Sequence, residues 1–194
     1  LKPNFVDVRL FNRPTSSSSG SGTRVVVVSR LSQDKDPITA IRAFARAKKE
    51  VHEATLQIIG YGPLHEYANS LIQNLNLEGA VTMLGKKTDV RKFLWNNDIF
   101  VATRGSYIAT LEAWAAGLAV IAPEFGIMNE LISNNENGLL VPPGNIDRLA
   151  TAMISLMRNK DLRLAIAAKG AQALEKHDIR KVAPSISGIY KSLL

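Results

Sequence analysis

The chain has 194 residues, of which 46% are hydrophobic and 21% are charged, a balance typical of one globular domain with a buried core. Its formal net charge is +7, and the absence of cysteine excludes disulfides, thiolate metal sites and a cysteine nucleophile. No run approaches the roughly 20 apolar residues of a membrane-spanning helix and no secretory leader opens the chain, so a cytoplasmic protein is expected.

The positive charge favours anionic partners. Lysine and arginine are scattered along the chain, only 6% of the residues are aromatic, and no nucleic-acid-binding motif occurs. We therefore expect a phosphorylated small molecule, and no nucleic acid, as the ligand. The three histidines, His52, His65 and His177, are isolated in the sequence, so they are predicted to be surface residues and no metal site is expected.

The beginning of the chain differs in composition from the rest. Residues 1–14 are predicted to form an extended segment that ends at Pro14, and residues 15–22 are a flexible Ser/Gly run that cannot bury apolar surface. We expect residues 1–22 to be a linker and residues 23–194 to form one folded domain.

From Arg24 onward, short apolar runs alternate with helical patterns. Four consecutive valines, Val25–Val28, are typical of a strand that is buried on both faces, and Asp36-Pro37 supplies a cap and a first residue for a helix. The predicted strands are 25–28, 56–59, 81–84, 99–102, 119–122 and 138–141. The first helix is predicted to begin at residue 36, and the second to begin at residue 63 and end at residue 75. The later predicted helices are 89–95, 106–116, 128–132, 146–158, 160–175 and 179–192.

Strands that alternate with helices predict parallel crossovers, and therefore an α/β fold with a Rossmann-like, doubly wound parallel sheet of six strands. In such sheets ligands bind beyond the carboxyl ends of the strands, where the strand order changes direction. The loops that follow the strands are therefore the candidates for the functional site.

The loop after the first strand carries two cations, Arg30 and Lys35, five residues apart. Arginine offers a planar fork of donors and lysine a compact charge, a combination that suits a pyrophosphate. The spacing alone is equally compatible with a solvated surface loop. The turn Gly60–Pro63 after the second strand is, by itself, typical of an ordinary strand-to-helix connection.

The helix predicted to begin near Ser106 directs its free N–H groups and the positive end of its dipole at the sheet edge, which favours a phosphate. Glu112 lies about two turns into this helix and is suited to accept hydrogen bonds from ribose hydroxyls. An exposed helical glutamate without a ligand is the alternative.

Seven segments in the right order and spacing give the chain a resemblance to the C-terminal domain of glycosyltransferase family 4, a group of retaining GT-B enzymes. These are Asn4–Asp7 with Phe11 and Pro14, Val28–Leu31 with Lys35-Asp36, Ile59–Pro63, Leu84-Gly85, Leu111–Gly117, Gly126–Glu130 and Gly138–Asn145. The resemblance covers about residues 4 to 160. It implies the C-terminal half of a GT-B fold.

The resemblance also implies roles for individual residues. Arg30 and Lys35 match the catalytic cations that hold the donor diphosphate and stabilise the charge on the leaving group without a metal. Glu112 matches the glutamate that binds the donor ribose. The amides near Tyr107 and Ile108 match the helix start that meets the phosphates, and Gly85 and Lys86 match the nucleobase loop. The remaining implied donor-binding residues are Gly60, Gly62, Arg104, Gly105 and Ser106.

The implied function is transfer of a sugar from a UDP- or GDP-sugar, with retention of configuration, to an unknown acceptor. The acceptor-binding N-terminal domain is missing from this chain, so the isolated chain is expected to bind a nucleotide sugar without turning it over. A glycan or a lipid is the expected acceptor, and a lipid acceptor would place the full-length enzyme at the membrane surface.

The sequence also departs from the family pattern. Arg104 stands where the family has a glutamate that contacts the transferred sugar, Ser106 and Tyr107 replace a Phe-Gly pair, and Ile127 replaces a glycine. Arg104 could add a phosphate contact, read an acidic sugar, or mark a degenerate copy. A catalytically inactive nucleotide-binding module, a GT-B-fold nucleotide-sugar epimerase and a basic surface for anionic membranes are therefore kept as alternatives.

Overall fold

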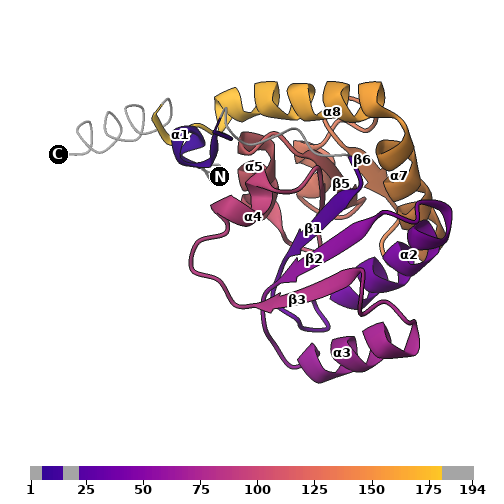
Figure 1. Cartoon of the computed structure of the whole chain (residues 1–194). Coiled ribbons are helices and arrows are strands. Elements are labelled where there is room, and N and C mark those ends of the chain that lie inside the picture. Colours follow the sequence, from indigo (N-terminus) through magenta and orange to yellow (C-terminus); the bar gives the residue numbers. More distant parts are fainter. Residues whose placement is uncertain (1–5, 15–21, 181–194) are drawn as a thin grey trace.

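A computed structural model describes residues 6–14 and 22–180, and its centre is one six-stranded parallel sheet with the order β3-β2-β1-β4-β5-β6 (Figure 1). The strands are β1 (Arg24–Val28), β2 (Thr55–Ile59), β3 (Val81–Gly85), β4 (Ile99–Val101), β5 (Ala119–Pro123) and β6 (Leu139–Val141). Every neighbouring pair is parallel. The predicted fold class and all six predicted strands are thus confirmed.

Helices cover both faces of the sheet (Figure 1). They are α1 (Val8–Phe11), α2 (Pro37–Glu50), α3 (His65–Asn74), α4 (Arg91–Trp95), α5 (Tyr107–Ala115), α6 (Met128–Leu131), α7 (Ile146–Arg158) and α8 (Lys160–Ala173), with a 3-10 turn at Leu174–Lys176. Helices α2, α3 and α7 contribute to one core, and α4, α5 and α6 contribute to the other.

Successive side chains of a strand point to opposite faces of the sheet, so the valines of β1 divide between the two cores. Val25 and Val27 are fully buried in the core beneath α2, and Val26 is fully buried in the core beneath α5. The prediction of a strand buried on both faces is therefore confirmed, and β1 is fixed rigidly below the loop that carries Arg30.

The start of α2 follows the predicted cap. The Asp36 side chain accepts hydrogen bonds from the Thr39 N–H at 3.3 Å and from the Thr39 hydroxyl at 2.8 Å, and Pro37 is the first helical residue. This cap ends the β1–α2 loop at a defined place directly after Lys35.

The prediction of an extended segment over residues 1–14 was wrong where Val8–Phe11 form α1. The Asp7 side chain accepts a hydrogen bond from the Arg9 N–H at 3.1 Å, and the Trp95 indole N–H donates to the Phe11 carbonyl at 2.7 Å. Both bonds stabilise a helical turn that is too short to show a periodic pattern. Residues 1–5, residues 15–21 of the Ser/Gly run, and positions 181–192 of the last predicted helix lie outside the described residues.

Candidate functional site

The strand order changes direction between β1 and β4: the chain adds β2 and β3 on one side of β1 and then β4, β5 and β6 on the other. At this switch point the loops after β1 and β4 meet at the carboxyl edge of the sheet and line an open concavity. We call it the α5 pocket. Its lining consists of Val28, Ser29, Arg30, Lys35 and the segment Gly105–Ala109. The structure therefore brings together both predicted cations and the start of the predicted phosphate-binding helix.

The ammonium group of Lys35 lies over the start of α5. A Cβ atom added to Gly105 would come within 2.8 Å of the Lys35 Nζ, and Gly105 has a positive φ of 68°. The Arg104 N–H donates to the Lys35 carbonyl at 3.3 Å, so the two loops are also joined through their backbones. Lys35 has one weak ion pair, with Asp34 at 3.9 Å, and within the described ranges Arg30 has none.

The first turn of α5 has no side-chain cap. The Ser106 hydroxyl instead accepts a hydrogen bond from the Thr103 N–H at 3.2 Å, and the first N–H that bonds back to Ser106 is that of Thr110, at 2.9 Å. Across the described part of the chain, no hydrogen bond occupies the N–H groups of Tyr107, Ile108 and Ala109. Three free donors at the positive end of a nine-residue helix form a binding surface for an anion.

Glu112 lies one turn beyond the pocket lining on the same helix and is half-buried. Burial raises the pKa of its carboxyl above the ordinary value. None of the hydrogen bonds or ion pairs among the described residues involves this carboxyl group. The carboxylate therefore carries a desolvation cost that a hydrogen-bonding ligand would offset.

The glycines after β2 support the pocket from behind. The space that a Cβ at Gly60 would need is filled by the Ser29 carbonyl oxygen, only 1.8 Å away, and at Gly62 by the Leu31 carbonyl oxygen at 2.4 Å. Their absent side chains allow the β1–α2 loop to lie directly on the β2–α3 turn. Neither glycine lines the α5 pocket, and the structure gives both a positioning role for the loop of Arg30.

Gly85 and Lys86, predicted to lie near the nucleoside, are at the end of β3, beyond β2 from the pocket. The Gly60 N–H donates to the Gly85 carbonyl at 2.9 Å, which ties this end to the β2 turn. Lys86 is exposed, and neither residue lines the α5 pocket. Their contact with a nucleoside stays a prediction.

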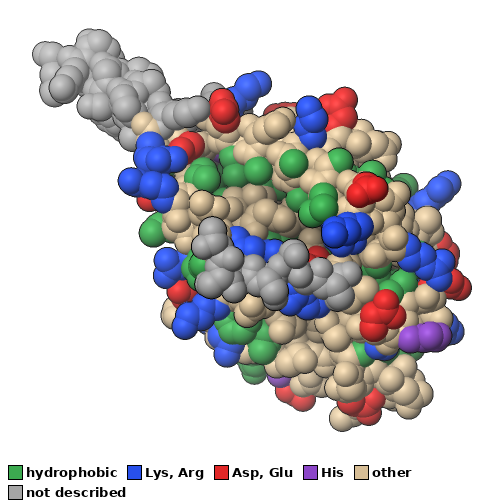
Figure 2. Space-filling model, turned by 45° about the horizontal axis from the view of Figure 1, so that its top comes forward, with side chains coloured by type: hydrophobic (Ala, Val, Ile, Leu, Met, Phe, Trp, Pro, Cys, Tyr) green, Lys and Arg blue, Asp and Glu red, His purple; other side chains and the backbone are tan. Residues whose placement is uncertain are grey.

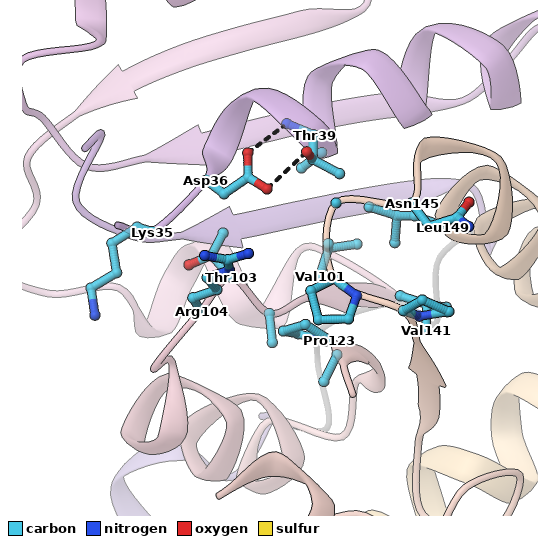
Figure 3. A pocket seen from close by; sticks show the side chains of 16 residues that line it. Lys35, Asp36, Thr39, Val101, Thr103, Arg104, Pro123, Val141, Asn145 and Leu149 are labelled. Carbon is cyan, nitrogen blue, oxygen red and sulfur yellow. Dashed lines mark hydrogen bonds between the residues drawn. The ribbon is translucent and has the colours of Figure 1, made fainter. Parts of the chain in front are cut away.

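Arg104 lines a second, partly open concavity, which we call the β4–β6 cavity (Figure 3). It lies between the carboxyl ends of these three strands and the starts of α2 and α7. Sequence reasoning missed its wall at Pro142–Asn145, although the position of this loop after the last strand could have indicated it.

The prediction for the histidines was right for His52, which is exposed, and wrong for the other two, which are partly buried. The Tyr107 hydroxyl lies 3.2 Å from Nδ1 of His177, and the ring of His65 packs against Tyr61 with their centroids 4.8 Å apart. Within residues 6–14 and 22–180, no group of three or more His, Asp or Glu side chains could hold a metal ion.

The charges on the molecular surface are mixed. Figure 2 shows Lys and Arg side chains spread over the face in view, with Asp and Glu side chains between them. None of the helices in the described ranges has the length and the apolar character needed to span a bilayer.

A family model described as glycosyl transferases group 1 matches residues 9–173. The chain belongs to this family. It is 31% identical over 176 residues to the GDP-mannose-dependent α-(1-6)-phosphatidylinositol monomannoside mannosyltransferase of Mycobacterium tuberculosis, covering 84% of this chain and 43% of that protein. Of the curated relatives compared, the chain spans between 16% and 53% of their length.

Solved structures share the fold. The Anabaena protein HepE in complex with UDP and glucose superposes with a TM-score of 0.84 at 21% identity, covering 97% of this chain and 55% of that one. The C-terminal domain of the group 1 protein LpcC from Francisella tularensis gives 0.78 at 23% identity, covering 87% of this chain and 96% of that one. The expected architecture, the C-terminal half of a GT-B fold, is thus confirmed.

Proposed function

We propose that this chain is the nucleotide-sugar-binding domain of a retaining glycosyltransferase that acts without a metal. One observation carries the proposal: Arg30, Lys35 and the three free N–H groups of α5 face one concavity at the switch point of the sheet. Two cations and aligned amide donors match the charge and size of a diphosphate. Membership of the glycosyl transferases group 1 family supports a sugar attached to that diphosphate.

The proposed chemistry is electrostatic. When the bond between the anomeric carbon and the diphosphate oxygen breaks, its electron pair stays on the oxygen, and negative charge accumulates on the leaving nucleoside diphosphate. Lys35 over Gly105, Arg30 and the amides of α5 lie where they stabilise this charge. The acceptor would bind on a separate N-terminal domain, joined through residues 1–22, and attack from the cleft between the two halves.

Binding of nucleoside diphosphates tests this function directly. The M. tuberculosis relative is named as GDP-mannose-dependent and HepE is solved with UDP, so UDP and GDP are the probes and ADP is the comparison. Calorimetric titration is expected to show saturable binding of UDP or GDP to the chain. An absence of binding by either at millimolar concentration would contradict the proposal.

The isolated chain is expected to bind its donor without transferring the sugar. The acceptor half supplies the second wall of the reaction site, and without it water and acceptor are not positioned for attack. Incubation of the chain with UDP-glucose or GDP-mannose and a mixture of glycan acceptors should release free UDP or GDP at the background rate. Efficient transfer by this chain alone would show that no second domain is required.

Transfer by the full-length protein separates an active enzyme from an inactive binding module, and a product that is an epimer of the donor would identify an epimerase.

Replacing Glu112 with glutamine is expected to stabilise the fold and weaken nucleotide binding together. Because burial raises the pKa of Glu112 in the folded state above that in the unfolded state, its ionisation destabilises the fold as the pH rises past the unfolded-state pKa. The penalty is complete above the folded-state pKa and absent below the unfolded-state pKa. The variant Glu112→Gln should therefore have a higher Tm than the parent at pH 7, with the gain shrinking towards pH 4. Loss of the charged acceptor for ribose hydroxyls should lower UDP or GDP affinity about tenfold.

A matched control is Glu136→Gln, which removes an exposed carboxylate from the turn before β6. This variant should leave both Tm and affinity near the parent values. Inorganic pyrophosphate, which has no ribose, should bind the parent and Glu112→Gln equally. If pyrophosphate binding falls as much as UDP binding, Glu112 does not act on the ribose.

A further inference from the structure

The β4–β6 cavity and the α5 pocket meet at Lys35, which lines both of them. Figure 3 shows Lys35 and Arg104 on one side of the cavity and Asn145 and Leu149 on the opposite side. Between them the labelled apolar side chains of the strand ends form the floor, which consists of Val101, Pro123 and Val141. Lys35 is therefore shared by the two concavities, and the second of them has a partly apolar floor.

Some polar side chains around this cavity are already hydrogen-bonded within the protein, whereas others are free to bind a ligand. Asp36, the one carboxylate in its lining, accepts two hydrogen bonds from Thr39, and the Asn145 side chain accepts the Arg148 N–H at 2.9 Å as the cap of α7. Arg104 takes part in no ion pair in the portion of the chain that the structure covers. The free polar side chains at the mouth of the cavity are therefore cationic.

The backbone of Arg104 is tied to the β1–α2 loop, and its guanidinium group lies near an aromatic ring. Its backbone N–H donates to the Lys35 carbonyl at 3.3 Å, and its guanidinium carbon lies 5.6 Å from the centre of the exposed Phe125 ring after β5. A cation over an aromatic face is attracted by the ring and keeps its N–H donors free at its edge. This arrangement presents a fork of donors suited to a planar carboxylate.

The strand order fixes which part of a nucleotide sugar meets this fork. In the proposed function the diphosphate binds at the junction of β1 and β4, and the nucleoside is predicted to lie near Gly85 and Lys86 after β3. The transferred group would then extend the other way, over β4, β5 and β6. We propose that the β4–β6 cavity binds the transferred sugar and that Arg104 pairs with a carboxylate on it, so the donor is a nucleoside diphosphate linked to an acidic sugar of the uronic acid class. This inference rests on the proposed function and adds the class of the sugar to it.

The test compares acidic and neutral donors on the same chain. UDP, UDP-glucose and UDP-glucuronic acid are titrated calorimetrically, or GDP, GDP-mannose and GDP-mannuronic acid if GDP binds more tightly than UDP. The parent is expected to bind the acidic sugar nucleotide at least about tenfold more tightly than the neutral one, as a charge-assisted hydrogen-bonded pair requires. In Arg104→Gln this ratio should fall towards one. Arg148→Gln, an exposed arginine outside the cavity lining, is the matched control and should keep the parent ratio.

Three results would overturn the inference. A parent ratio near one shows that the cavity does not recognise an acidic group. An equal loss of affinity for UDP and for both sugar nucleotides in Arg104→Gln shows that Arg104 contacts the phosphates instead. If neither UDP nor GDP binds the parent, the proposed function itself fails, which is distinct from nucleotide binding without an acidic preference. Because Arg104 is exposed, the Tm of Arg104→Gln should match that of the parent, and this measurement confirms that the variant is folded.

Discussion

Replacing both Arg30 and Lys35 with alanine is expected to weaken UDP or GDP binding by roughly 100-fold or more. Each charge-assisted hydrogen bond to a phosphate contributes about 1.5–3 kcal/mol, and each 1.4 kcal/mol corresponds to about tenfold in affinity. Lys35 lies over the start of α5 and Arg30 lines the same pocket, so both reach the place where we propose that the α5 amides bind a diphosphate. Calorimetric titration of parent and double variant measures the loss.

The control for this double variant must remove the same net charge elsewhere. Lys160 and Lys169 are exposed on α8 and line neither cavity, so Lys160→Ala/Lys169→Ala lowers the net charge by two without touching the site. This variant should bind UDP or GDP within about threefold of the parent, the loss expected from the weaker long-range field. If the two double variants lose the same affinity, binding depends on overall charge and the diphosphate site is placed wrongly.

The sequence predicted that Arg30, Lys35 and the start of α5 lie close together, because in a parallel sheet the loops after neighbouring strands meet at one edge. Lys35 and Gly105 are 70 residues apart, yet they meet because β1 and β4 are neighbours and each loop follows a carboxyl end. The strands themselves were predictable since their short, β-branched runs are too apolar to be exposed. The local sequence pattern and the fold class together were therefore enough to predict that Arg30 and Lys35 lie beside the start of α5.

Features that depend on a single distant contact were not predictable. The turn Val8–Phe11 is stabilised by the Trp95 indole, and the partial burial of His177 accompanies its contact with Tyr107. Neither partner leaves a periodic trace in the sequence. The wall of the β4–β6 cavity at Pro142–Asn145 was also missed: its place after the last strand could have indicated it, but its shape depends on how α2 and α7 approach the strand ends.

The structural role of Gly60 was also not predictable, although the sequence had indicated this residue as part of the candidate site. The pattern indicated a tight turn and a donor contact, whereas the structure shows that the glycine makes room for backbone from another loop. Only the coordinates reveal which backbone approaches it. We expect the glycine to affect ligand binding through the position of the β1–α2 loop, and this expectation can be measured.

The substitution Gly60→Ala is expected to destabilise the fold by about 3 kcal/mol. Its φ of 145° lies in a region that residues with a side chain rarely adopt, and the added Cβ would lie 1.8 Å from the Ser29 carbonyl oxygen, so the backbone must move. For a chain of this size, such a loss lowers Tm by roughly 6–12 °C. Denaturant unfolding measures the free energy, and a calorimetric scan measures Tm.

The control is Gly79→Ala, where the added Cβ meets open space. This variant should stay within about 0.5 kcal/mol of the parent. The second measurement is UDP or GDP affinity at a temperature where Gly60→Ala is still folded: displacement of the Ser29 carbonyl also shifts Arg30, so affinity should fall in this variant and not in Gly79→Ala. Normal stability of Gly60→Ala would show that the two loops are not in contact. Reduced stability with unchanged affinity would show that the β1–α2 loop adapts without moving its cations, and the positioning role of Gly60 would then be wrong.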